Sequence, residues 1–90
     1  MAVIAVLQGG IKLVEVEISA ENTGTSAADV SASATVGEVS RILGIVGYYR
    51  EDTKNSGVTI SVTLPNTVNV TFQSVPAGET TKVKVTLLGY

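Results

Sequence analysis

The clearest pattern in the chain is an alternation of apolar and polar residues between Gly57 and Phe72. Apolar side chains take every second position on each side of Pro65-Asn66: Val58, Ile60, Val62, Leu64, then Val68, Val70 and Phe72. A period of two in β-branched residues around a turn dipeptide is typical of an antiparallel hairpin. The pattern therefore predicts two paired strands with one face packed inside the protein and one polar face outside.

Five further segments have strand-like patterns, and turn signals separate them. They are Ala2 to Leu7, Ile11 to Ser19, Asp29 to Val36, Val39 to Arg50, and Thr80 to Leu88. Polar or Gly/Pro-rich stretches at 21–28, 51–56 and 75–79 provide the loops between them. In the last segment Lys82 and Lys84 alternate with apolar residues, which favours an exposed or edge strand.

The segment Val39 to Arg50 is the most apolar and allows two structures. Val39, Ile42, Leu43 and Val46 fit one face of a helix. Gly44 and Gly47, however, would each cost a helix interior about 1 kcal/mol relative to Ala. We favour a central strand buried on both faces, with the helix as the alternative.

About seven short strands in 90 residues predict an all-β fold in one domain, residues 1–90: an antiparallel β-sandwich or a small barrel. The expected core is aliphatic: Ile4, Val6, Val16, Ile18, Val30, Val36, Leu43, Ile45, Val58, Ile60, Val62, Val68, Val70, Phe72, Val83, Val85 and Leu87. With one Phe and no Trp, such a core provides no aromatic-lined ligand pocket.

Composition argues against most catalytic and nucleic-acid functions. The chain has no Cys and no His, so it lacks the commonest metal ligands and the usual general base near neutral pH. Its net charge is −2, and its six Lys and Arg residues are scattered rather than gathered into a basic patch. We therefore expect no enzyme activity, no cofactor, no metal site and no nucleic-acid partner.

The N-terminal apolar run has no basic residue before it and is too short for a signal peptide or a membrane span. We therefore expect that the protein is made in the cytoplasm and does not associate with a membrane. A component of a virus particle made in a host cytoplasm would have the same features.

Two groups of acidic residues could in principle carry chemistry. Glu15 and Glu17 share one strand face, where they could form an acid and base pair or bind a cation. A solvated face paired with Lys82 or Lys84 is the favoured interpretation. Glu51, Asp52 and Asn55 suggest calcium, but their order does not match the spacing of an EF-hand loop.

Tyr48, Tyr49 and Arg50 form the best candidate for an interaction site, because Tyr and Arg dominate binding hot spots. Adjacent strand residues point to opposite faces, so we expect one tyrosine in the core and the other at a partner surface. A tyrosine that caps the open end of a sandwich is an equally good interpretation. Tyr90 has the same ambiguity, and the apolar C-terminal end is expected to dock on this subunit or a neighbour.

Two family resemblances add to this picture. The segments Val14 to Val36, with Asn22-Thr23-Gly24-Thr25 between two strands, and Val75 to Leu87 resemble the two ends of immunoglobulin-like adhesion modules from bacteria and archaea. That resemblance covers about a third of the chain and implies an immunoglobulin-like sandwich that serves as a spacer or binding unit on a surface.

The second resemblance is to small virion proteins of tailed phages, of the head decoration or cement type. Such proteins are similar in being short, free of Cys and rich in Ser, Thr and Val, and 41–49, RILGIVGYY, and 85–90, VTLLGY, look like segments of them. The resemblance implies a structural protein of the virion that binds the outer surface of an assembled capsid in many copies, often as trimers. Its partners would be capsid protein and other copies of itself.

Edge strands are the expected means of such binding, because their backbone donors and acceptors can pair with another chain. We expect Ala2 to Leu7 to pair first, with Val3 and Ala5 at the interface, and Lys82 to Tyr90 second, with Leu88 and Tyr90. Three function classes therefore remain: a virion structural protein as the leading hypothesis, an immunoglobulin-like surface module, and a small carbohydrate-binding domain.

Overall fold

The computed structural model describes residues 2–50 and 55–90, and most of these residues lie in β-strands. Seven strands follow one another along the chain: β1 (Ala2–Val6), β2 (Lys12–Glu21), β3 (Ala28–Thr35), β4 (Ile42–Tyr49), β5 (Gly57–Thr63), β6 (Thr67–Val75) and β7 (Thr80–Gly89). A short 3-10 turn, η1 (Gln8–Gly10), joins β1 to β2. The described residues include no α-helix, and within the segment from Val39 to Arg50 the favoured strand is present as β4, Ile42–Tyr49.

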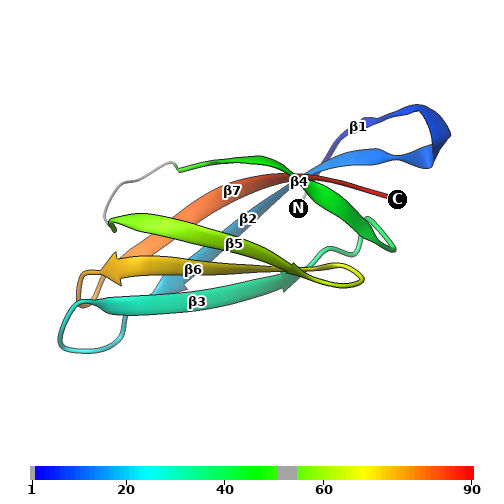
Figure 1. Ribbon diagram of the computed structural model, residues 1–90. Coiled ribbons are helices and arrows are strands. Elements are labelled where there is room, and N and C mark those ends of the chain that lie inside the picture. The colour runs from blue at the N-terminus through cyan, green and yellow to red at the C-terminus, as the bar shows by residue number, and fades with distance from the viewer. Residues whose placement is uncertain (1, 51–54) are drawn as a thin grey trace.

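The strands form two antiparallel sheets that pack as a β-sandwich (Figure 1). One sheet has the order β1-β2-β7-β4 and the other the order β3-β6-β5. β3 lies against β2, and β6 lies against β2 and β7, so β4 and β5 form the same lateral side of the sandwich. The molecule is elongated, with extents of 48 × 22 × 16 Å.

The division into four and three strands is that of a constant-type immunoglobulin domain, but the allocation of two strands differs. In that domain the fifth strand belongs to the four-stranded sheet and the seventh to the three-stranded sheet. Here β7 lies in the four-stranded sheet and β5 in the three-stranded sheet. The chain is therefore a β-sandwich with the same division of strands but a different topology.

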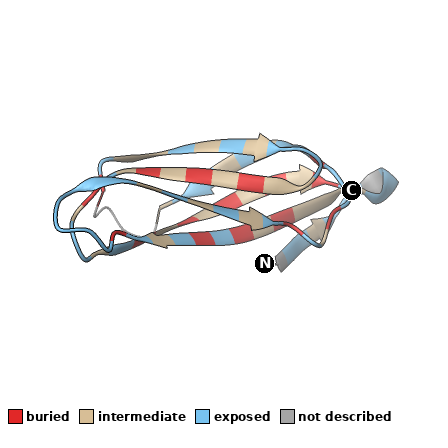
Figure 2. Ribbon diagram, turned by 90° about the horizontal axis from the view of Figure 1, so that it is seen from below, coloured by how far each residue is buried: buried red, intermediate tan, exposed pale blue. Residues whose placement is uncertain are grey.

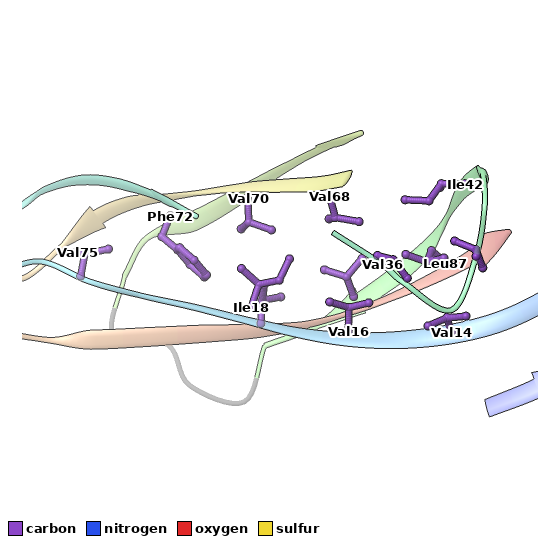
Figure 3. Close-up of a cluster of buried hydrophobic side chains, with 13 residues drawn as sticks. Val14, Val16, Ile18, Val36, Ile42, Val68, Val70, Phe72, Val75 and Leu87 are labelled. Carbon is purple, nitrogen blue, oxygen red and sulfur yellow. The ribbon is translucent and has the colours of Figure 1, made fainter. Parts of the chain in front are cut away.

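The core lies between the two sheets and is almost entirely aliphatic (Figure 3). Its buried members are Val14, Val16, Ile18, Val36, Val39, Ile42, Val68, Val70, Phe72, Val75, Val83, Val85 and Leu87. Buried positions alternate with half-buried or exposed ones along β2, β6 and β7 (Figure 2). The alternation that predicted the strands thus also identifies their inward faces, and full burial of a Val or Leu side chain contributes about 1.5–3 kcal/mol.

Three residues expected in the core are exposed instead. Ile4 and Val6 are 53% and 66% exposed, because β1 lies beyond the part of the first sheet that the second sheet covers. Leu43 is 53% exposed because it occupies a register shift in β4. Five other expected core residues pack against the core but are only partly buried: Val30, Ile45, Val58, Ile60 and Val62. The expected core also omitted four buried residues: Val14, Val39, Ile42 and Val75.

The sequence patterns assigned two strands to the wrong places in the sheet. β4 is an edge strand with most of its side chains exposed, not a central strand buried on both faces. β7, expected to be an exposed or edge strand, lies between β2 and β4. The expectation that Lys82 to Tyr90 pairs with another chain as an edge strand is therefore wrong, because β7 already has a partner strand on each side. Its lysines occupy the outer face of a central strand, where Lys84 lies directly opposite Glu17. Charge on one face therefore indicates solvent above that face, and not a free strand edge.

Candidate interaction surface

The exposed large apolar side chains define the candidate surface. They lie mainly on β1, on β4 and at the chain's C-terminal end: Val3, Ile4, Val6, Leu7, Leu43, Val46, Tyr48, Tyr49, Leu64 and Tyr90. The β1–β2 hairpin, the start of β4, the β5–β6 turn and the C-terminus all lie at the same end of the elongated molecule (Figure 1). Apolar surface is thus concentrated at that end.

The N-terminal hairpin projects β1 away from the sandwich (Figure 1). β1 pairs only with the first part of β2, so its other edge has no partner strand among the described residues. Val3 lies opposite the buried Val14, on the inward face of the sheet, yet no strand of the second sheet covers that side of β1. Gly9 and Gly10 close the hairpin with positive φ, a conformation that glycine adopts without strain. β1 therefore presents a free backbone edge together with exposed apolar side chains.

Ala5 and Leu88 belong to one apolar row on the outer face of the first sheet. Leu13 of β2 lies opposite Ala5 on one side and opposite Leu88 of β7 on the other, and Gly44 of β4 lies opposite Leu88. Gly44 has open space above it, so the row ends without a side chain at the β4 edge. The two expected interface segments thus meet on one face.

Tyr90 is fixed by its backbone while its ring remains half-exposed. The amides of Ser40 and Arg41 donate to the Tyr90 carbonyl over 2.5 Å and 3.1 Å, and the Tyr90 amide donates to the Arg41 carbonyl over 3.1 Å. Gly89 packs directly on this segment, since a Cβ there would lie 2.7 Å from the Arg41 carbonyl oxygen. The C-terminal end therefore docks on its own subunit and presents the Tyr90 side chain at the surface.

The prediction that one of the two tyrosines of β4 enters the core is wrong. Tyr48 and Tyr49 are 55% and 65% exposed. Tyr48 lies opposite the buried Val85 and shares its inward face, but β4 is the last strand of its sheet, so the ring remains at the open side of the sandwich. Tyr49 lies opposite Lys84 on the outer face.

Arg50 is bound inside the protein. The half-buried Arg50 donates from Nη2 to the backbone oxygen of Asn55 over 2.7 Å and to its Oδ1 over 2.8 Å. Asn55 is itself buried; its Oδ1 also accepts from the Thr81 hydroxyl over 2.9 Å, and its Nδ2 donates to the Gly57 carbonyl over 2.5 Å. These bonds tie the end of β4 to β5 and β7, so the Arg50 guanidinium acts as an internal clamp beside the tyrosines.

The acidic residues that the structure describes do not converge on a site. Glu15 and Glu17 lie on the outer face of β2, opposite Thr86 and Lys84, as expected for a solvated strand face. Glu51 and Asp52 lie outside the described residues, and the Asn55 side chain is committed to the clamp. In residues 2–50 and 55–90 there is neither a cluster of three or more potential metal ligands nor a cavity.

Sequence reasoning missed Leu43 and Val46 as surface residues, because it placed β4 inside the sheet. Both occupy register shifts in the pairing of β4 with β7. The sequence did contain a signal for these shifts. Gly44 and Gly47 interrupt an uncharged run from Ile42 to Tyr49, and glycine within a strand often marks a bulge.

Comparison of the chain with protein-family models, with curated proteins and with solved structures found no match. Among the described residues, no helix has the length and apolarity needed to cross a membrane.

Proposed function

We propose that this chain is a non-enzymatic structural protein of a virus particle, of the capsid decoration type, which binds the assembled shell through β1. The observation that carries the proposal is the β1 strand itself. It projects from the sandwich with a free backbone edge, and its hairpin exposes Val3, Ile4, Val6 and Leu7. Such an edge is a template for strand addition by an arm of another protein.

The energetics of β1 favour a protein partner. Its four large apolar side chains are each about half-exposed, so covering them would contribute about 1 kcal/mol apiece, in addition to the backbone hydrogen bonds. The segment from Ala2 to Leu7 contains no charged residue. Docking of β1 on a partner therefore buries no unpaired charge. The free-energy cost of burying such a charge, which would oppose binding, does not arise.

An immunoglobulin-like surface module is the alternative that the sandwich architecture supports. A carbohydrate-binding function has less support. The outer face of the β3-β6-β5 sheet is rich in hydroxyl groups, but several of its polar groups already bond one another, as in Ser31 with Thr71, Asn69 with Thr63, and Gln73 with Thr59. No residue of β3, β5 or β6 on that face is aromatic, so no ring is available there for stacking on a sugar.

Co-sedimentation with assembled shells of the virus that encodes the chain tests the proposal. The double variant I4K/V6K places two charges on β1 at exposed positions, and we expect it to reduce shell binding at least tenfold with little change in thermal stability. The matched control S33K/T35K, at exposed positions of β3, should bind as wild type does. Absence of wild-type binding to the shells would refute the decoration function, whereas unchanged binding of I4K/V6K would refute the role of β1.

A further inference from the structure

In the part of the chain that the structure describes, the two sheets have four free strand edges, which differ in how well they are protected against pairing with another chain. The register of β1 shifts between Val3 and Ala5, and that of β4 shifts twice. β3 has a shift near its start and carries Asp29. Bulges and charges of this kind shorten the stretch of an edge that can pair in regular register, so β1 can take up a short arm of another protein but not a long, regular strand. β5 has neither: it pairs with β6 without a shift from Gly57 to Thr63 and contains no charged residue and no proline.

The sequence of β5 is also nearly symmetric about its centre. Residues 58–62 are Val, Thr, Ile, Ser and Val. In an antiparallel pair of two such strands centred on Ile60, Val58 of one copy faces Val62 of the other, and Thr59 faces Ser61. Ile60 faces its own counterpart. Each cross-strand pair thus joins two β-branched apolar residues or two hydroxyl groups, combinations that stabilise sheets.

We propose that two copies of the chain associate through β5, in antiparallel register about a two-fold axis at Ile60. The two three-stranded sheets then form one continuous six-stranded sheet. Two-fold contact requires a patch that complements itself, and the symmetric strand meets that requirement. The pairing is twofold, unlike the trimer that the phage resemblance implies, and it does not depend on binding to a capsid.

The partial burial of side chains on β5 also favours a dimer formed through this strand. Val58, Ile60 and Val62 pack against the core but are only half-buried, because β5 is the last strand of its sheet. The exposed ring of Tyr48 lies on β4, on the same lateral side. A second copy paired with β5 would cover the apolar side chains of β5 and the Tyr48 ring. A single edge strand with one flanking ring forms an interface below the standard size, so we expect a dimer with a dissociation constant of about 10–100 μM.

Sedimentation equilibrium of the purified chain between about 5 μM and 1 mM tests the proposal, and charge pairs test its register. In the proposed register, residue 59 of one copy faces residue 61 of the other. T59K/S61K therefore places lysine opposite lysine, and T59K/S61E places lysine opposite glutamate. We expect T59K/S61K to weaken the dimer at least tenfold and T59K/S61E to restore it to within about threefold of wild type. The control S31K/S33K, at exposed positions on the edge strand β3, should dimerise as wild type does.

Disulfide formation provides a second readout of the register, because the chain has no cysteine of its own. A mixture of T59C and S61C proteins should form a mixed disulfide dimer at least five times faster than either protein alone. A wild-type chain that stays monomeric to 1 mM, a trimer, or equal dissociation of the lysine–lysine and lysine–glutamate variants would each overturn the proposal.

Discussion

Substitution of Gly89 by Ala tests how tightly the C-terminal end is packed. Gly89 is buried in β7 between Lys12 of β2 and Ile42 of β4. A Cβ at this position would lie 2.7 Å from the Arg41 carbonyl oxygen and 2.9 Å from Val39 Cγ1. The first of these atoms belongs to the backbone, so rotation of a side chain cannot relieve the contact. Either β7 or the segment from Val39 to Arg41 must move.

The cost of that movement follows from what it disturbs. Overpacking of a well-packed site costs typically about 1–3 kcal/mol. The shift also strains the three hydrogen bonds that join Tyr90 to Ser40 and Arg41, each of which contributes about 1 kcal/mol. We expect G89A to lower the free energy of unfolding by about 2–4 kcal/mol. That is a large share of the roughly 5–14 kcal/mol that is typical of a chain this long. A loss of 2 kcal/mol would lower Tm by about 8–16 °C.

Urea unfolding followed by circular dichroism measures this loss, and Gly44 supplies the matched control. Gly44 also lies in the four-stranded sheet, but nothing lies within 4 Å of a Cβ placed there. G44A should therefore change the free energy of unfolding by less than about 0.5 kcal/mol, or raise it slightly, because Ala restricts the unfolded chain more than Gly does. Equal stability of G89A and wild type, or an equal loss in both variants, would refute the packing argument.

Three further predictions concern buried groups. N55A should lose about 2–3 kcal/mol in urea unfolding because it leaves the Arg50 guanidinium and Thr81 without their shared acceptor, whereas the exposed S56A should change stability by less than 0.5 kcal/mol. N22A should lose a similar amount and should speed hydrogen exchange at the Gly24 amide, which donates to Asn22 Oδ1 over 2.9 Å. F72A should lose about 3–5 kcal/mol as the largest fully buried side chain of the core; a loss below 1 kcal/mol in a thermal melt would contradict this.

Local patterns identified the seven strands correctly, and on β5 and β6 they also identified the inward faces. The alternation from Gly57 to Phe72 gave β5 and β6, and its apolar residues on β6 are buried in the structure. Gly44 and Gly47 correctly argued against a helix from Val39 to Arg50. These inferences succeed because the period of side chains along a strand is a property of the backbone itself, and each residue experiences it regardless of its partners.

Whether a strand's face is buried depends on the neighbouring strands and sheet, which the local sequence pattern does not specify. Val6 and Val16 were both expected in the core, yet Val16 is fully buried and Val6 is mostly exposed, because β2, unlike β1, lies beneath the second sheet. The lysines of β7 suggested an exposed or edge strand and the apolar run of β4 suggested a central strand, but in the sheet β7 is central and β4 is at the edge. Sheet order arises from pairings far apart in sequence, such as Gly89 with Lys12.

The sequence by itself therefore determined that the protein is an all-β chain with an aliphatic core and neither His nor Cys for catalysis. The tertiary structure decided which apolar residues complete that core and which remain at the surface, as on β1 and β4. The physical reason is that the backbone fixes the direction of each side chain locally, whereas the exclusion of water from a face requires a second sheet above it.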